Sequence, residues 1–283
     1  MAIQIITDSA SDVRPGEYSN ITVLPMHICF GDEDFKDGYD LSHEEFYNKL
    51  IETDVLPTTS QIPPYDFSEA IRPIREQGDE VLIITMSAKL SGTYQSAVLA
   101  ASEFADGVAV VDSSNATMGE KALICYALQR IEQGTSLTAL ADELNTAKDR
   151  IRLIALLDTL EYLKKGGRLS AGAATVGELL SIKPVLSITE GDINVLGKAH
   201  GSKNGHNLLI RYTEESGGID FSMPLFLGYT GLSDRLLQKY IKDSHALWEE
   251  HMTADSLPIL SVGATIGTHA GPGAIAVAFF AKS

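Results

Sequence analysis

Short apolar runs alternate with longer helical patterns along the first half of the chain. The runs are rich in β-branched residues and occupy residues 3–7, 21–30, 80–86 and 107–112. Runs of this length and composition predict buried strands. Because helical patterns separate them, the first half is expected to form an α/β fold, a mostly parallel sheet with helices on both faces.

Two of the predicted helices have clear signals at their ends. The segment LSHEEFYNKLIE (41–52) places Ser42 and Glu45 in the S-x-x-E spacing of a capping box, in which each side chain bonds the other residue's backbone N–H. The segment MGEKALICYALQRIEQG (118–134) ends at Gly134, a residue type that commonly stops helices. Helices are therefore expected over both segments.

The second half of the chain has a different pattern. Its apolar runs lie at 151–158, 183–188, 224–230, 258–267 and 274–280, with a hairpin-like stretch at 191–200 and helical patterns at about 206–216 and 232–250. This order predicts a second, α+β subdomain over residues 151–283, beside a first subdomain over residues 1–150. Because no Pro/Gly/Ser-rich linker separates the two, they are expected to share an interface.

The charge balance excludes two classes of partner. The 283-residue chain has 38 acidic and 22 basic residues, a net charge of −16. Because nucleic acids and anionic membranes repel such a surface, neither polynucleotide binding nor stable membrane association is expected. The N-terminus has no basic flank or apolar stretch of a signal peptide, and no run reaches the length of a transmembrane helix, so a cytoplasmic protein is expected.

Polar residues follow three of the predicted strands. Asp8 and Ser9 follow the first, the segment MSAKLSGTYQSA (86–97) follows the third, and Asp112 begins the D-S-S-N segment after the fourth. Ligands of open α/β sheets bind outside the carboxyl ends of strands, so these groups are expected to converge on one crevice. Each of them could also be an ordinary helix cap.

Two segments in this region carry neutral hydrogen-bond donors. Ser91 and Gly92 stand where a loop becomes a helix, and the first N–H groups of a helix attract anions. The prolines that flank TTSQ in the segment 57–64 predict an extended, irregular loop. A carboxylate or phosphate would fit the first segment, whereas the second could be a plain surface turn.

Catalytic and metal-binding alternatives are weaker. Ser91 lies in K-L-S-G-T, which lacks the first glycine of the G-x-S-x-G nucleophile elbow, although Ser91 and His269 could still form a triad with Asp8 or Asp112. The histidine pairs and acidic residues lack the spacing of zinc or EF-hand sites, so no metal is expected. An esterase or acyl-transferase using Ser91 and His269 remains the alternative to a binding protein.

Taken together, these motifs resemble the DegV family of bacterial fatty-acid-binding proteins. The resemblance covers nearly the whole chain, through the segments ITDSASD, TTSQ, LSGTYQSA, VVDS with MGEKAL, LDTLEYLKKGGRLS, LLSIKPVL, GKAHGSK and GTHAGPGA. It implies a two-domain α/β protein that encloses one long-chain fatty acid, needs no cofactor and has no catalytic activity. Such carriers present the acyl carboxylate to an ATP-dependent fatty acid kinase, which makes acyl phosphate for phospholipid synthesis.

The resemblance also assigns roles to particular residues. It implies that Thr59, Ser91 and His269 bind the carboxylate, and that His269 donates a hydrogen bond, in charged form if the anion raises its pKa. Glycines beside His269 let the backbone approach the ligand closely. The full set of implied ligand-binding residues is Thr59, Ser60, Ser91, Gly92, His269 and Gly271.

Two further positions are expected to contact the kinase. Arg168 in K-K-G-G-R-L-S matches a basic motif of the family, although a cation after a helix also favours the helix dipole. His200 replaces the arginine of the family's G-K-A-R-G motif. Because histidine and arginine differ in charge and donor geometry, this replacement puts the partner contact in doubt more than the lipid binding.

Overall fold

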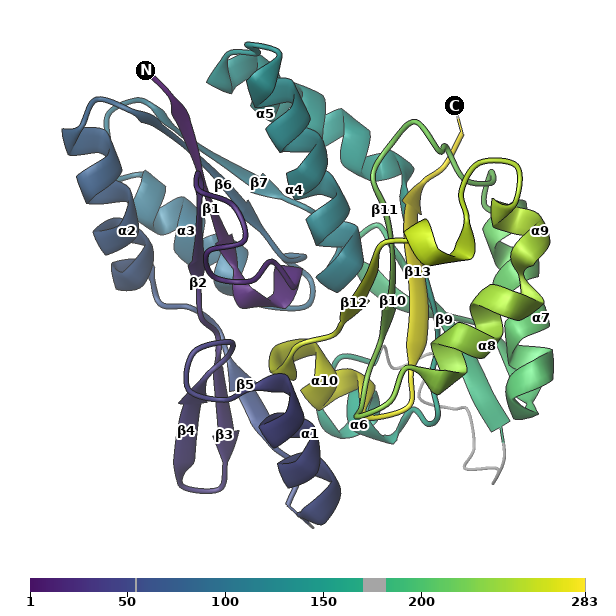
Figure 1. The fold of residues 1–283 in the computed structure, drawn as a ribbon. Coiled ribbons are helices and arrows are strands. Elements are labelled where there is room, and N and C mark those ends of the chain that lie inside the picture. Colours follow the sequence, from purple (N-terminus) through teal and green to yellow (C-terminus); the bar gives the residue numbers. More distant parts are fainter. Residues whose placement is uncertain (54, 170–181, 283) are drawn as a thin grey trace.

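The computed structural model describes residues 1–53, 55–169 and 182–282. The first half contains a parallel four-stranded sheet in the order β2-β1-β6-β7 (Figure 1). Its strands are β1 (Ile3–Asp8), β2 (Ile21–Leu24), β6 (Glu80–Thr85) and β7 (Val108–Asp112). The expected parallel sheet of an α/β fold is therefore confirmed.

Helices cover both faces of this sheet, as the apolar runs predicted. On β1, Ile6 packs in a cluster with Phe67 of α2 (Pro64–Glu76) and Ala97 of α3 (Thr93–Ala101). The neighbouring Ile5 packs in a second cluster with residues of α4 (Thr117–Glu132) and α5 (Leu137–Ala147). Adjacent side chains of a strand point to opposite faces, so both faces of a covered sheet must be apolar.

The apolar run at 21–30 forms two strands in different sheets, so its prediction as one strand was wrong. Pro25 has no backbone N–H to donate, and the chain leaves the first sheet there. The strand β3 (His27–Phe30) then pairs with β4 (Glu33–Lys36) and β5 (Thr58–Ser60) in an antiparallel sheet. The segment expected as an irregular loop is thus extended but contributes an edge strand, β5.

The helix α1 (His43–Glu52) packs against this small sheet. Ser42 accepts a hydrogen bond from the N–H of Glu45, and the Glu45 carboxylate accepts one from the N–H of Ser42, so the predicted capping box is confirmed. The predicted stop of α4 near Gly134 is also confirmed, since Gly134 adopts a left-handed conformation with φ +80°.

The second half contains a six-stranded sheet in the order β10-β9-β8-β13-β11-β12. Its strands are β8 (Ile151–Leu156), β9 (Ile182–Thr189), β10 (Asp192–His200), β11 (Leu225–Tyr229), β12 (Ile259–Ser261) and β13 (Ile275–Phe280). All neighbours are antiparallel except β11 and β12. One face is covered by α7 (Gly201–Glu215), α8 (Arg235–Asp243) and α9 (His245–Trp248) (Figure 1).

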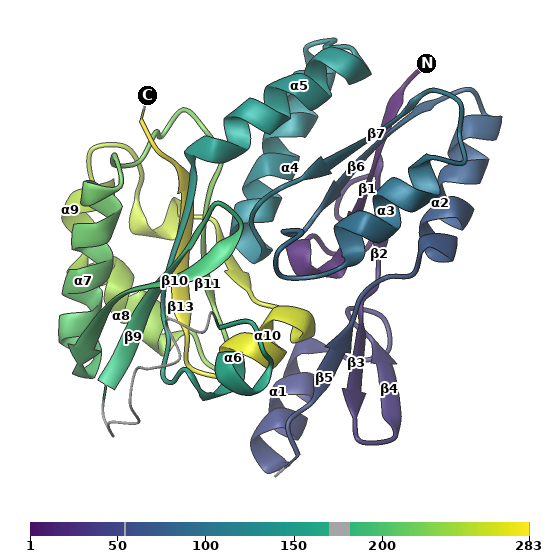
Figure 2. The ribbon, with the colours of Figure 1, turned by 180° about the vertical axis from the view of Figure 1, so that it is seen from behind.

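Two short helices lie near the other face of this sheet, α6 (Glu161–Lys165) and α10 (Ala264–Ala270), which are side by side (Figure 2). The run at 258–267 is therefore a strand only over β12, and Gly263 precedes α10. Single turns of 3-10 helix complete the described elements at Ser9–Ser11, Lys148–Arg150 and Ala254–Ser256.

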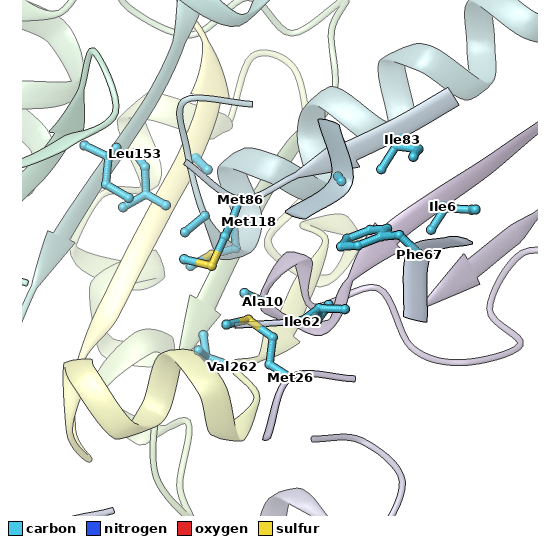
Figure 3. Packing of buried hydrophobic residues seen from close by; sticks show 14 of the residues in the cluster. Ile6, Ala10, Met26, Ile62, Phe67, Ile83, Met86, Met118, Leu153 and Val262 are labelled. Carbon is cyan, nitrogen blue, oxygen red and sulfur yellow. The ribbon is translucent and has the colours of Figure 1, made fainter. Parts of the chain in front are cut away.

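One apolar cluster joins the two halves. Figure 3 shows Ile6, Met86 and Met118 of the first half in the same cluster as Leu153 and Val262 of the second. All strands of the four-stranded sheet precede residue 150 and all strands of the six-stranded sheet follow it. We therefore propose a division of the chain near residue 150, with a shared core across it. In the described part of the chain, no helix has the length and apolar character to cross a membrane.

Candidate ligand-binding site

A cavity lies between the two halves, against the face of the six-stranded sheet that the helices α7 and α8 do not cover. Most of its described lining is apolar. The apolar lining residues are Met26, Met86, Leu90, Ala116, Met118, Leu153, Ala155, Leu157, Leu163, Leu186, Ile188, Ile193, Val262, Ile266, Ala270, Ala274, Ile275 and Ala276. The polar ones are Thr59, Ser91, Thr117, Arg168, Ser187, Tyr229, Thr230, Thr265 and His269.

A row of small residues forms the floor of the cavity. The strand register places Ala155 of β8 beside Ala276 of β13, and Ala276 beside Gly228 of β11. Alternate residues of β8 face the cavity: Leu153 and Ala155 line it, while Ile154 between them packs on the other side of the sheet, in the cluster beneath α7. A Cβ at Gly228 would lie 2.6 Å from the sulfur of Met118, so larger residues in this row would fill the space.

The segments expected to line a pocket contribute to this floor. The stretch VGELLSIKPVLSI (176–188) provides Leu186, Ser187 and Ile188. Its residues 176–181 lie outside the described residues. The segments around β11 and β13 contribute Gly228 and Ala276 of the small row. In the sequence these are small residues inside otherwise bulky apolar strands. Only the strand register shows that they lie side by side.

Thr59 and His269 meet at the polar part of the cavity. The Thr59 hydroxyl lies 2.9 Å from Nε2 of His269, across 210 residues of sequence. Thr59 lines the cavity because it sits in the middle of β5, whereas the neighbouring Ser60 is exposed and is not part of the lining. Side chains of a strand alternate between its two faces, so Thr59 faces the cavity and Ser60, its neighbour in the motif T-T-S-Q, faces away.

Ser91 lies two residues before α3 and is also in the lining. It is only 9% exposed, and its hydroxyl lies 2.9 Å from the hydroxyl of Thr93. Gly92 does not line the cavity, but it permits a close contact, because a Cβ there would lie 1.9 Å from the side-chain oxygen of Gln61. Gln61 follows β5, so Gly92 brings the Ser91 loop against the segment that carries Thr59.

His269 lies in the last turn of α10. Its Nδ1 atom is buried and has no hydrogen-bond partner among the described residues. The ring fits tightly against Gly166, since a Cβ at Gly166 would lie 2.3 Å from Nδ1. Gly271 ends α10 with φ +69°, and a Cβ there would lie 2.3 Å from the ring of Tyr162.

Burial, and secondarily the nearby charge of Arg168, lowers the pKa of His269 to about 4. Removing an imidazolium from water is unfavourable, and the guanidinium repels a second positive charge. Without a bound anion, His269 is therefore neutral at pH 7 and can donate only one ring N–H.

Arg168 reaches into the same cavity. Its Nε donates to the carbonyl oxygen of Leu90 at 3.2 Å, and its Nη1 donates to the carbonyl oxygen of Gly166 at 2.6 Å. No other lysine or arginine is among the described lining residues. The permanent positive charge of this site thus comes from Arg168, beside Ser91 and His269. By contrast, His200 is exposed at the end of β10 and is not in the lining.

A hydrolytic triad is not assembled among the described residues. The described hydroxyl contact of Ser91 is with Thr93, and no acidic side chain bonds Nδ1 of His269. Asp8 and Asp112, the acids considered for this role, accept backbone N–H groups of neighbouring loops. A triad needs its base hydrogen-bonded to both the nucleophile and an orienting acid.

The same bonds account for the polar residues at the strand ends. Asp8 accepts the N–H of Met86 at 2.8 Å and Asp112 accepts the N–H of Ala88 at 3.2 Å, so these loops do converge. Their carboxylates hold the loop that leads to Ser91 rather than facing the cavity. In the described part of the chain, no cluster of three or more His, Cys, Asp or Glu side chains could hold a metal ion.

Comparisons with known proteins match nearly the whole chain. The family model described as uncharacterised protein, DegV family, matches residues 2–282. A DegV domain-containing protein of Caldanaerobacter subterraneus is 33% identical over 283 residues, covering 99% of both chains.

Solved structures with the same fold include a DegV family protein from Thermus thermophilus described by its fatty acid binding. It superposes with a TM-score of 0.86 at 30% identity, over 99% of this chain and 100% of that one. DegV of Bacillus subtilis, described as a fatty acid binding protein, superposes with a TM-score of 0.82 at 26% identity over 100% of both chains.

Proposed function

The chain belongs to the DegV family, and from this membership and the cavity we propose that it binds one long-chain fatty acid. The carboxylate would lie among Thr59, Ser91 and His269, and the acyl chain would extend over the small-residue floor. The observation that carries the proposal is a largely apolar cavity in which the Thr59 hydroxyl, the His269 imidazole and the Arg168 guanidinium lie near one another. An amphiphile with one anionic end has this distribution of polarity.

The acyl chain would supply most of the affinity. At about 0.8 kcal/mol per buried CH₂, roughly fifteen methylenes contribute on the order of 12 kcal/mol before entropy losses. Two or three neutral donors add about 1 kcal/mol each. The net charge of −16 does not prevent binding, because long-range repulsion is screened over about 8 Å at physiological salt.

The head-group residues would orient the carboxylate. Ser91 and Thr59 provide hydroxyl donors, and His269 provides one N–H in its neutral form. The fixed charge of Arg168 compensates the anion, and binding of the anion would in turn raise the pKa of His269 by opposing the repulsion from Arg168.

We further propose that the protein presents this carboxylate to an ATP-dependent fatty acid kinase. The kinase would transfer the terminal phosphoryl group of ATP to a carboxylate oxygen, which gives acyl phosphate and ADP for phospholipid synthesis. Because this reaction uses ATP, the proposed role would be carried out in the cytoplasm. In this role the protein is a carrier without catalysis of its own, and exposed His200 is available for the kinase contact.

Ser91→Ala and His269→Ala should impair presentation more than retention of the lipid. Each substitution removes one donor, so the Kd for palmitate should rise about fivefold. Acyl phosphate formed with ATP and a fatty acid kinase, trapped as hydroxamate, should fall about tenfold or more, because the carboxylate loses its orientation.

Ser60→Ala is the matched control, because Ser60 neighbours Thr59 but is exposed; it should change neither quantity. Complete loss of bound lipid in both Ser91→Ala and His269→Ala would contradict the separate roles of tail and head group. Turnover of a short p-nitrophenyl ester by the unmodified protein, abolished by Ser91→Ala, would instead establish a hydrolase.

A further inference from the structure

The helix α10 carries His269 in its last turn but is held at its start by an acidic residue of the first half. Asp37, which is 4% exposed, follows β4. Its Oδ1 accepts the N–H of Ala264 at 3.2 Å, and its Oδ2 accepts the N–H of Thr265 at 3.1 Å and the hydroxyl of Thr265 at 2.6 Å. The helix's own N-cap residue, Gly263, has no side chain that could accept these hydrogen bonds.

A second carboxylate fixes the residue before the helix. Asp12 accepts the N–H of Gly263 at 2.7 Å and the hydroxyl of Thr117. Both Asp12 and Thr117 have left-handed backbones, with φ of 56° and 48°. For a β-branched residue such as threonine this conformation is unfavourable, so surrounding contacts must maintain it.

The side of α10 packs closely against α1. A Cβ at Gly267 would lie 2.6 Å from Cε1 of Phe46 and 2.6 Å from the hydroxyl of Tyr47, so the backbone of α10 touches α1 directly. Thr265 and His269 are four residues apart, one helical turn. A shift at the start of the helix is therefore transmitted to the imidazole.

We propose that Asp37 is a positioning residue for the carboxylate site, and that it sets the place of His269 relative to Thr59 through the start of α10. Asp37 does not itself line the cavity. This inference rests on the proposed function of the cavity, because the contact between His269 and a ligand carboxylate is part of that proposal. It links the β3–β4–β5 sheet of the first half to the head-group site by a single short helix.

The first test follows the imidazole without any ligand. In protein with isotope-labelled histidine, Asp37→Asn should shift the NMR signals of His269 while the other six histidines keep theirs. Asp37→Ala, which removes all three bonds, should shift them further. Asp32→Asn, at an exposed acid of the β3–β4 turn, is the charge-matched control and should leave His269 unchanged. An unchanged His269 signal in folded Asp37→Asn would overturn the proposal.

The second test is a double-mutant cycle on acyl phosphate formation. Asp37→Asn should lower the hydroxamate yield about tenfold while the Kd for palmitate changes less than about threefold. If Asp37 acts through His269, adding Asp37→Asn to His269→Ala should cause no further loss. Additive losses would overturn the proposal. Absence of palmitate binding by the unmodified protein would instead refute the proposed function, and the ligand-free NMR comparison would still decide the role of Asp37.

Discussion

Ala155→Trp should abolish tight binding of long-chain fatty acids. The substitution places an indole in the row formed by Ala155, Ala276 and Gly228, where the acyl chain is expected to lie. Displacing about four methylenes removes about 3 kcal/mol of transfer free energy, which corresponds to a rise of about a hundredfold or more in Kd. Competition with a fluorescent fatty acid would measure this loss for palmitate and, in parallel, for decanoate.

Decanoate should lose less affinity than palmitate, because a shorter chain reaches less of the floor. Ala155→Gly, which places no additional side-chain atoms in the cavity, is the matched control and should retain palmitate. Ala155→Leu should have an intermediate effect, so the series remains informative if the tryptophan variant folds poorly. A folded Ala155→Trp protein that binds palmitate with unchanged affinity would show that the acyl chain lies elsewhere.

The protein should be more stable near pH 5.5 than near pH 7.5. Burial raises the pKa of Asp8 and of Asp12 to about 7, and it also raises the pKa of Asp37 and of Glu120. Between about pH 4 and 7, Asp8 and Asp12 hold their protons in the native state but not in the unfolded state. The free energy of unfolding therefore falls as the pH rises through this range.

The net effect of this change is a few kcal/mol. Between about pH 5.5 and 7.5, Asp8 and Asp12 each remove about 2 kcal/mol. His269 acts in the opposite direction, because its lowered pKa leaves it neutral in the native state while the unfolded state binds a proton below about pH 6.5; this returns about 1 kcal/mol. Groups with lowered pKa, such as Asp220 and Asp243, lose their contribution only at lower pH.

Urea unfolding at the two pH values measures this effect. The wild-type midpoint should be lower at pH 7.5, and Asp12→Asn, which cannot ionise, should lose about two thirds of the pH-dependent difference. A wild-type midpoint that rises between pH 5.5 and 7.5 would show that these carboxyls are ionised in the native protein.

The strands β1, β6 and β7 of the parallel sheet were predictable because local pattern and tertiary environment agree. Ile5 and Ile6 are adjacent apolar residues on opposite faces of a covered sheet, so the run itself reports burial on both sides. The run at 21–30 failed as one strand because Pro25 interrupts a pattern that is apolar on both sides of it. A proline in an apolar run is stronger evidence for a boundary than the run is for continuity.

The helix α10 shows what local sequence does not contain. The segment GATIGTHA has two glycines, which have low helix propensity, and no side chain to cap its start. Its cap comes from Asp37, more than two hundred residues earlier in the chain. Only the folded chain brings the two together, so the apolar run at 258–267 gives no local signal that a helix begins at Ala264.

The candidate site was predictable in part. The motifs that carry the family resemblance include Thr59, Ser91 and His269, which the fold brings to one cavity. Strand alternation exposes Ser60, and the same motifs do not reveal that Arg168 faces the cavity. Its place follows from the bond between its side chain and the carbonyl of Leu90, a long-range contact without a local signal.

The central claim is that one fatty acid occupies the cavity between the two halves. Denaturing extraction of the purified protein, followed by mass spectrometry of the released small molecules, tests it most directly. We predict one long-chain fatty acid per chain, and its loss from purified Ala155→Trp protein. A protein that releases no lipid and takes up no added palmitate would contradict the claim and leave the cavity without its proposed ligand.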